Sequence, residues 1–182
     1  MSNQSVNENM NSSDVSKKVE PIHPLSDKWT LWAHLPHDTN WSIDSYSQIF
    51  TFSTIEESIA LCETLPEKMV KNCMLFLMKE NVKPTWEDPA NRSGGCFSYK
   101  INNKQVSEIW KSMFYHVIGN SISNNKQFIK SVNGITISPK KNFCIIKVWL
   151  NNSNYQNPDF IRVKNLTTQA CLFKKHCPRS GR

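Results

Sequence analysis

The segment "VSEIWKSMFYHVIG", residues 106–119, has the most regular hydrophobic pattern of the 182-residue chain and decides its fold. Its apolar residues recur three and four positions apart, which is the spacing of one face of an α-helix. They are Val106, Ile109, Trp110, Met113, Phe114, Val117 and Ile118. Gly119 follows as a C-terminal stop signal. The pattern predicts a helix with one buried side, which a second layer of structure must cover.

Short apolar runs bounded by turn residues surround this segment and predict strands. The runs are residues 29–35, 47–52, 73–78, 96–101, 127–137, 143–150 and 170–174. A second helix is predicted to begin at Ser53 or Thr54, because each has a glutamate three positions later as in a capping box. It ends near Leu65, before Pro66. A third helix is predicted over 158–168, with proline in its first turn.

Strands in hairpin-like order with interspersed helices predict an α+β domain, in which an antiparallel sheet has helices on one face. The other face is then free to bind a ligand. Hydrophobic residues make up 38% of the chain, which at this length suffices for one core and not for two. We expect a disordered, Ser/Asn-rich tail at residues 1–20, one domain over 21–177 and a short tail at 178–182.

Cysteine usage and hydropathy indicate the compartment. The six cysteines are scattered without a C-x-x-C pair, and no apolar run near the N-terminus resembles a secretory signal. No segment approaches the roughly 18 consecutive apolar residues of a membrane span. We expect a monomeric cytoplasmic protein with reduced thiols that is not bound to a membrane.

Positive charge is concentrated in the last third of the chain. Residues 1–125 hold 11 Lys and Arg against 14 Asp and Glu, whereas residues 126–182 hold 11 against Asp159 alone. Such a basic region suits an anionic partner, phosphates above all. A solvated lysine-rich face is the alternative interpretation.

The six tryptophans fall into groups of different character. Trp29, Trp32 and Trp110 lie in apolar strand or helix patterns and are expected in the core. Trp41 and Trp86 lie in the polar segments HDTNWSID and KPTWEDPAN, where no periodic pattern supports burial. Large aromatic side chains on loops suggest binding, unless they fold over the core as a lid.

The residues around the loop tryptophans predict a particular ligand. Indole faces stack on nucleobases and attract cations, so a cationic base gains from both effects. The carboxylate of Glu87, next to Trp86, suits the N1–H and N2–H donor pair of guanine, which adenine and uracil lack. Phosphates attached to that nucleoside would meet lysines of the C-terminal third. Together these features predict a site for the 7-methylguanosine cap of messenger RNA.

Five motifs, in order and at similar spacing, resemble those of the eukaryotic translation initiation factor 4E family, the cap-binding proteins. The resemblance covers residues 22–176 and implies a curved antiparallel sheet with three helices packed on its convex face and the cap in its concave face. The motifs are HPLSDKWTLW (23–32), TIEESIALCETL (54–65), KPTWEDPANRSGG (83–95), EIWKSMFYHVIGNSI (108–122) and IIKVWL (145–150).

The resemblance also implies roles for individual residues of the base site. Trp41 and Trp86 match the two indoles that sandwich the base, and Glu87 matches the carboxylate that reads guanine. Trp149 matches the tryptophan that contacts the N7-methyl group. Asp88 matches a structural residue, which leaves it outside the site.

The phosphate-binding positions depart from the family. The family's arginine, its lysine and the basic residue after the double glycine are here Ser138, Ile145 and Cys96. An apparent insertion in the same loop supplies other lysines. The candidates for phosphate binding are Lys140, Lys141 and Lys147, with Lys147 favoured because it shares a strand face with Trp149.

The family docks a factor 4G-type scaffold, or a competing 4E-binding protein, on its helical side. Of the residues that the resemblance assigns to this surface, one departs from the family: Ile59 stands where a tryptophan is usual, so we expect weakened or non-standard partner binding. The predicted docking residues are His23, Pro24, Leu25, Ile55 and Ile59.

Two alternatives stay open beside cap-dependent initiation. A repressor or decoy would bind the cap without recruiting the scaffold, and a general single-stranded RNA binder would not need Glu87. An enzyme is not expected, because the chain has no second carboxylate cluster, no phosphate-cradling glycine loop and no Cys-His-acid set. No metal or other cofactor is expected, since His176 and Cys177 lack partners at zinc-finger spacing.

Overall fold

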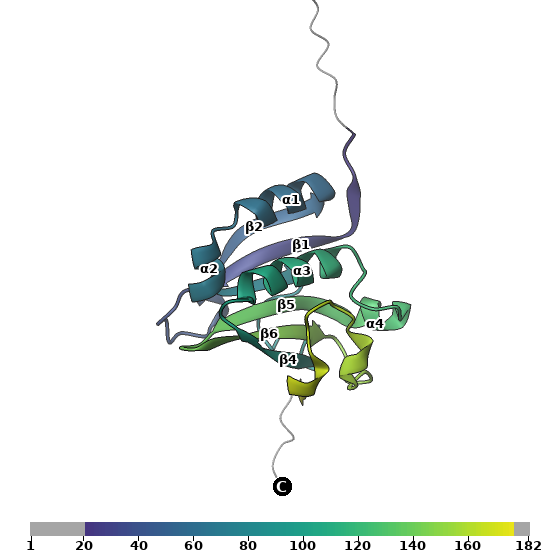
Figure 1. The fold of residues 1–182 in the computed structure, drawn as a ribbon. Coiled ribbons are helices and arrows are strands. Elements are labelled where there is room, and N and C mark those ends of the chain that lie inside the picture. Colours follow the sequence, from purple (N-terminus) through teal and green to yellow (C-terminus); the bar gives the residue numbers. More distant parts are fainter. Residues whose placement is uncertain (1–20, 177–182) are drawn as a thin grey trace, which may run out of the picture.

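One antiparallel sheet of seven strands forms the body of the protein, with the order β2-β1-β3-β5-β6-β4-β7 (Figure 1). The computed structural model describes residues 21–176. The tails predicted at residues 1–20 and 178–182 lie outside the described residues, so the domain boundaries stay predictions. The strands are β1 (Pro24–His34), β2 (Tyr46–Thr54), β3 (Met74–Lys79), β4 (Gly95–Asn102), β5 (Val132–Pro139), β6 (Phe143–Leu150) and β7 (Cys171–Lys175).

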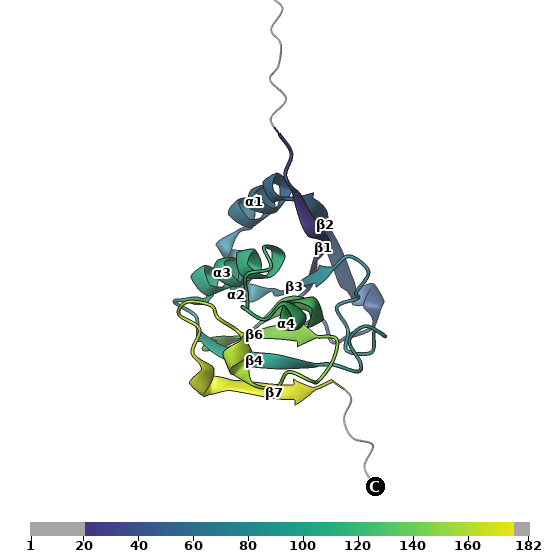
Figure 2. The ribbon, with the colours of Figure 1, turned by 90° about the vertical axis from the view of Figure 1, so that its right-hand side faces the viewer.

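The helices gather on the convex face of the curved sheet, as the resemblance implies (Figure 2). In the described part of the chain, no α-helix covers the concave face. The sheet therefore has one face committed to the core and one free for a ligand. The helices on the convex face are α1 (Ile55–Thr64), α2 (Glu67–Asn72) and α3 (Val106–Ile118), and the short α4 (Lys126–Ser131) leads into β5.

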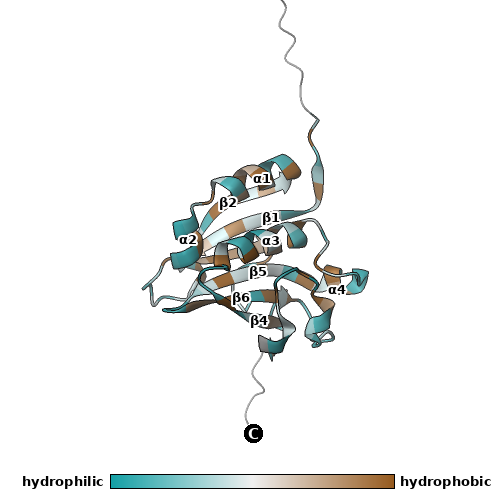
Figure 3. Ribbon diagram, in the orientation of Figure 1, coloured by the Kyte–Doolittle hydropathy of each residue, from teal (hydrophilic) through white to brown (hydrophobic). Residues whose placement is uncertain are grey.

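Helix α3 forms the centre of the main core. All seven apolar residues predicted on its inner side are buried, and Trp110 is only 2% exposed. They share one cluster with inward-facing strand residues such as Leu31, Leu77 and Ile135. Because successive strand residues point to opposite faces, apolar bands alternate with paler ones along the central strands (Figure 3). This packing confirms the helix that the sequence predicts.

A smaller apolar cluster lies on the concave face. It consists of Phe76, Met78, Val82, Cys96 and Trp149, all buried. Trp29 and Trp32 point to opposite faces of β1. Trp29 lies in the main core, and the partly buried Trp32 packs against the smaller cluster. The prediction of a core position is therefore confirmed for Trp29, whereas Trp32 supports the floor of the concave face.

Two of the predicted elements differ from the structure. The prediction of a helix over 158–168 is wrong, because only 3₁₀ turns form, at Pro158–Phe160 and Thr168–Ala170. Between these turns Ile161 and Val163, two positions apart, are both buried, which is the spacing of an extended chain and not of a helix. The run 127–137 is not one strand. Its first residues form α4, since the side chain of Asn125, the N-cap of α4, accepts hydrogen bonds from the backbone N–H groups of Gln127 and Phe128.

The double glycine at the start of β4, Gly94 and Gly95, allows three strands to approach closely. A Cβ atom at Gly94 would collide with the carbonyl oxygen of Leu150 in β6. At Gly95 it would lie 2.6 Å from the carbonyl oxygen of Lys174 in β7. Glycine is needed at both positions for steric reasons, and this packing sets β7 beside β4 on the sheet edge.

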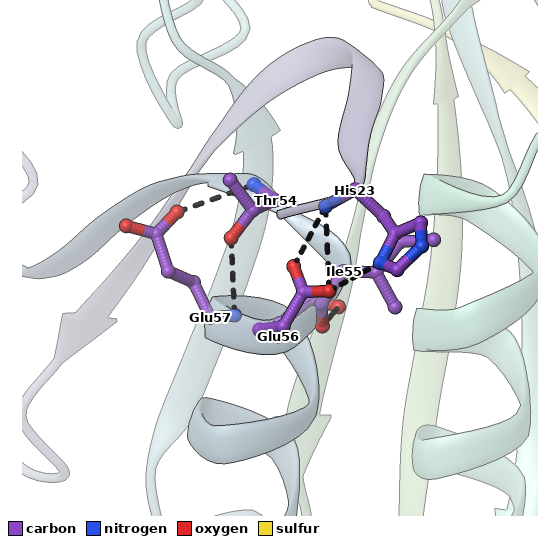
Figure 4. A network of polar contacts seen from close by, with 6 residues as sticks. His23, Thr54, Ile55, Glu56 and Glu57 are labelled. Atoms are coloured by element: carbon purple, nitrogen blue, oxygen red, sulfur yellow. Dashed lines mark hydrogen bonds and ion pairs between the residues drawn. The ribbon is translucent and has the colours of Figure 1, made fainter. Parts of the chain in front are cut away.

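A capping box fixes the start of α1, and the structure selects one of the two predicted positions (Figure 4). The hydroxyl of Thr54 accepts a hydrogen bond from the Glu57 N–H at 3.2 Å. The Glu57 carboxylate accepts in return from the N–H groups of Thr54 and Ser53, at 3.2 and 2.9 Å. Thr54 is thus the N-cap, and Ser53 belongs to β2.

We expect Thr54→Ala to lower the free energy of unfolding by about 1 kcal/mol, because the hydrogen bond at the N-cap is lost. Urea unfolding followed by circular dichroism measures the change. Ser53→Ala is the matched control, since within residues 21–176 the Ser53 hydroxyl forms no hydrogen bond. Equal unfolding midpoints for Thr54→Ala and the wild type would contradict the capping role.

Candidate functional site

A cleft of about 210 Å³ opens on the concave face of the sheet. All four residues predicted to hold the base, Trp41, Trp86, Glu87 and Trp149, line this one cleft, and so does Lys147. The two loop indoles are 55% and 46% exposed, so neither is a lid folded into the core. The remaining lining residues are Tyr46, Met74, Phe76, Pro84, Thr85, Thr136 and Ser138.

Buried amide groups hold the loop that carries Trp86 and Glu87. Asn91 is fully buried, and its side-chain amide donates to the carbonyl oxygens of Lys83 and Thr85 at 2.9 and 2.8 Å. Asn133 of β5 donates to the Asn91 side-chain oxygen at 2.9 Å. The loop is thereby tied to the middle of the sheet, which fixes where the indole stands.

Asp88 has a structural role, as the resemblance implies. Its carboxylate accepts hydrogen bonds from the N–H groups of Lys83 at 3.2 Å and Ala90 at 2.8 Å. Asp88 does not line the cleft. Of the adjacent pair of acids, only Glu87 is therefore available to a ligand.

The loop that carries Trp41 is held by short-range polar contacts. The Asp38 carboxylate accepts from the Asn40 N–H at 2.8 Å, and the Asn40 side chain accepts from the Ser42 N–H at 2.9 Å. His37 has a φ of 75°, an uncommon conformation for a residue other than glycine. The ring of His34 stacks on Trp41 with centroids 4.3 Å apart and planes 1° apart. The indole is thus placed by its neighbours in the loop and by β1.

Trp149 lies on the floor of the cleft. It is 7% exposed, and its indole N–H donates to the hydroxyl of Thr136 at 3.2 Å. The ring of His176 lies beside it with centroids 4.6 Å apart. His176 donates from Nδ1 to the carbonyl oxygen of Asn91 at 2.8 Å, and burial lowers the pKa of its imidazole. The sequence pattern assigns His176 no role in base binding, whereas the structure places it beside the site.

Glu87 is exposed and has no cationic partner within 4 Å among residues 21–176. Its charge reaches across the cleft to Tyr46. Burial raises the pKa of the Tyr46 phenol, and the negative charge of Glu87 raises it further. The carboxylate is therefore close to the cleft wall and free to accept hydrogen bonds from a ligand.

A basic pocket of about 360 Å³ continues the cleft. The two share Trp86, Lys147 and Trp149, so they form one groove. None of the residues that line the basic pocket is acidic. The groove is thus negative at the Glu87 end and positive at the other. The pocket is lined by Trp86, Cys96, Lys147, Trp149, Lys174, Lys175 and His176.

Sheet register brings two of these lysines to either side of Cys96. Cys96 of β4 pairs with Trp149 of β6 on one side and with Lys174 of β7 on the other. Lys147 pairs with Ser98, two residues along the same strand face. Burial raises the pKa of the Cys96 thiol, although the positive charges of Lys147 and Lys174 oppose that shift.

The phosphate candidates separate into two sets. Lys147 lies in the groove as strand alternation predicts, but Lys140 and Lys141 are exposed in the turn between β5 and β6 and line neither pocket. Sequence reasoning missed Lys174. Its strand was predicted, but which strand pairs with β7 depends on tertiary structure, so no local signal indicated its position.

A second, apolar groove of about 380 Å³ lies on the helical side of the molecule. Three of the predicted docking residues line it, namely Leu25, Ile55 and Ile59. His23 and Pro24 do not: His23 Nδ1 pairs with Glu56 at 2.6 Å (Figure 4), and Pro24 pairs with Thr54 at the start of β1. The other lining residues are Ser58, Glu63, Tyr115, Ile118 and Gly119.

Two further features are absent from residues 21–176. No three His, Cys, Asp or Glu side chains in this range gather as a metal-binding group. No helix in the same range is long and apolar enough to cross a membrane.

The chain is similar in sequence to several eukaryotic initiation factors 4E. The initiation factor 4E of Eremothecium gossypii is 30% identical over 141 residues, which cover 74% of this chain and 65% of that relative. The factor from Saccharomyces cerevisiae is 29% identical over 173 residues, covering 88% and 79%. A homolog from Acanthamoeba polyphaga mimivirus is 22% identical over 156 residues, covering 74% and 54%. The chain thus spans slightly less than two thirds of the first relative's length.

Solved structures share the fold. Schistosome initiation factor 4E complexed with m7GpppG and 4E-BP matches with a TM-score of 0.66 at 25% identity, covering 73% of this chain and 74% of that one. Ascaris suum factor 4E-3 with an m2,2,7G cap matches with a TM-score of 0.66 at 21% identity, covering 74% and 76%.

The fold and the groove define a class: a curved-sheet binding protein with two loop indoles, a free carboxylate and a basic extension on its concave face. Residues 24–176 match the family described as Eukaryotic initiation factor 4E. The chain belongs to this family.

Proposed function

We propose that this protein binds the 7-methylguanosine cap of messenger RNA in the groove of its concave face and acts in translation initiation. The observation that carries the proposal is that Trp41, Trp86 and Glu87 line one groove, whose far end is basic. A cap has the matching polarity, with a cationic base at one end and phosphates at the other. The m7GpppG complex of the Schistosome factor supports the same ligand.

The base would lie between the indoles of Trp41 and Trp86. Stacking on an aromatic side chain contributes roughly 1 to 3 kcal/mol per base, and the positive charge of the methylated ring adds a cation–π attraction of roughly 0.5 to 2 kcal/mol. The Glu87 carboxylate accepts the N1–H and N2–H of guanine as a charge-assisted pair. Trp149, on the cleft floor, is the surface for the N7-methyl group. A general RNA binder would have no use for Glu87.

The phosphates would lie in the basic pocket, between Lys147 and Lys174. These two ammonium groups flank Cys96, at the position where the family has a basic residue. Both line the pocket, from the two strands on either side of β4. We therefore assign the phosphate contacts to β6 and β7 in place of the exposed lysines at 140 and 141.

The helical groove is the proposed docking site for a 4G-type scaffold or a 4E-binding protein. Its surface is apolar at Leu25, Ile55 and Ile59, and the last two are 43% and 46% exposed. The 4E-BP in the Schistosome complex supports such a partner. Because Ile59 lacks an indole anchor, a standard partner would bind weakly. A protein that binds the cap without recruiting the scaffold would act as a repressor, which is the second proposed role.

We also propose that the protein is a cytoplasmic monomer that binds its ligand and does not act as an enzyme. The matched family is one of initiation factors, and the curated relatives are initiation factors by description. The groove supplies stacking, one carboxylate and three lysines, which suffice to hold a cap.

Tryptophan fluorescence titration with m7GTP and GTP tests the base site. We expect m7GTP to bind about 2- to 30-fold more tightly, from the cation–π attraction. We expect Glu87→Ala to weaken m7GTP binding about 10- to 100-fold, because a charge-assisted hydrogen-bond pair is lost. Glu108→Ala, which removes an exposed carboxylate of α3 outside the groove, is the matched control and should bind m7GTP like the wild type. Equal affinity for the two nucleotides, unchanged in Glu87→Ala, would contradict cap recognition.

Salt dependence of binding tests the phosphate assignment. For a capped RNA oligonucleotide, we expect Lys147→Ala and Lys174→Ala each to reduce the slope of log affinity against log salt by about 1. Lys126→Ala removes the same charge from exposed α4, outside the groove, and should leave the slope unchanged. The assignment is wrong if Lys140→Ala and Lys141→Ala lower the slope while Lys174→Ala does not.

Peptide binding tests the docking groove. We expect Ile59→Trp to tighten binding of a 4G-type peptide about 5- to 30-fold, since a buried indole anchor often contributes strongly to an interface. Fluorescence polarisation measures the affinity. Ile49→Trp is the matched control, because Ile49 is also about half exposed, at 43%, but lies outside the groove. Strong wild-type binding that Ile59→Trp leaves unchanged would remove the hypothesis.

A further inference from the structure

The connection between β1 and β2 raises a physical problem for the proposed base site. Trp41 lies within residues 35–45, which contain only the short 3₁₀ turn Ile43–Ser45. An indole on a connection of this kind samples many positions unless something fixes it, and each unproductive position lowers the apparent affinity. The structure therefore has to hold this ring in place if the space between the indoles of Trp41 and Trp86, the base slot, is to accept a base without rearrangement.

His34, the last residue of β1, is the group that contacts the ring. It is 1% exposed and lies on the concave face, paired with Met74 of β3 and Tyr46 of β2. Its imidazole is parallel to the Trp41 indole within 1°, at 4.3 Å between centroids. The ring of Tyr46 meets the same imidazole at 5.0 Å and 61°. Two neighbouring strands thus set the position of the imidazole, and the indole lies flat on it.

A hydrogen bond sets the orientation of the imidazole. His34 Nε2 lies 2.8 Å from the carbonyl oxygen of Asn40. A carbonyl oxygen can only accept, so Nε2 carries the hydrogen and donates it. The residue bonded in this way directly precedes Trp41 in the chain. One side chain therefore anchors both the backbone next to the indole and the face of the indole.

The imidazole lies behind the indole as seen from the cleft. Trp41 lines the cleft and is 55% exposed, whereas His34 does not line it and is almost completely buried. The indole therefore has one covered face, against His34, and leaves surface free toward the ligand. A bound base would extend the same stack by one ring.

We propose that His34 is a positioning residue for cap recognition, acting as a fixed plate behind Trp41. This rests on the proposed function, since the plate matters to a ligand only if Trp41 contacts the base. The flat stack supplies the orientation of the indole, and the hydrogen bond to Asn40 supplies the position of the loop. Together they keep the slot open before the nucleotide arrives, so their loss slows association.

Three substitutions of His34 separate the plate from the donor. His34→Phe keeps a ring and loses the hydrogen bond, His34→Gln keeps a donor and loses the ring, and His34→Ala loses both. Thr30→Ala is the matched control, because Thr30 is also 1% exposed, lies on the same strand face and bonds to Thr51. It is expected to lower stability to a similar extent without touching Trp41.

Stopped-flow fluorescence with m7GTP measures the association rate. We expect His34→Gln, which loses the aromatic stack, to slow association about tenfold, and His34→Ala, which also loses the hydrogen bond, to slow it at least as much. His34→Phe, which keeps a ring, is expected to stay within about threefold of the wild type. Thr30→Ala should associate at the wild-type rate. The proposal is overturned if His34→Ala associates as fast as the wild type, or if Thr30→Ala is slowed as much.

Amide hydrogen exchange of the ligand-free protein tests the plate without a nucleotide. The N–H groups of Asn40 and Ser42 are bonded within the loop, and we expect His34→Ala to speed their exchange about tenfold. Unchanged exchange would overturn the proposal even if cap binding stands. If wild-type protein fails to bind m7GTP while His34→Ala still loosens the loop, the proposed ligand is wrong and the positioning contact holds.

Discussion

The burial of one side of α3 against the convex face of the sheet is the interaction on which the rest of the structure depends. Seven apolar side chains of this helix meet inward-facing residues of the central strands. Because hydrophobic burial is the largest favourable contribution to folding, it settles which face of the sheet is closed. The concave face is then left with a small apolar cluster and open space above it. Ligand binding follows from that one-sided packing.

Polar contacts then place the functional side chains over the open face. Buried Asn91 and Asn133 tie the loop of Trp86 to β5, and His34 with Asn40 holds the loop of Trp41 to β1. Buried amides and carbonyl groups need partners, so these contacts resist loop movement more than exposed ones would. The charge pattern is set by the sheet itself, because β6 and β7 bring lysines to one end of the groove. Rigidity and polarity thus come from different parts of the fold.

Sequence reasoning located what is local and missed what depends on pairing. Three features depend only on residues close together in the chain, and the sequence predicts each of them. They are the apolar period of α3, the capping box of α1 and the exposed indoles at 41 and 86. A short apolar run such as 127–137 fits a helix or a strand, so its pattern predicts strand where α4 forms. Lys174 enters the groove only through the pairing of β7 with β4, and His34 through a loop that folds back on its own strand. No linear pattern encodes those contacts.

A crystal structure of the protein with bound m7GTP would show whether the groove holds a cap. We predict the methylated base between the rings of Trp41 and Trp86, with N1 and N2 within hydrogen-bond distance of Glu87. We also predict the phosphates between Lys147 and Lys174. A nucleotide bound elsewhere on the surface, or a base in the cleft that makes no contact with Glu87, would contradict this prediction.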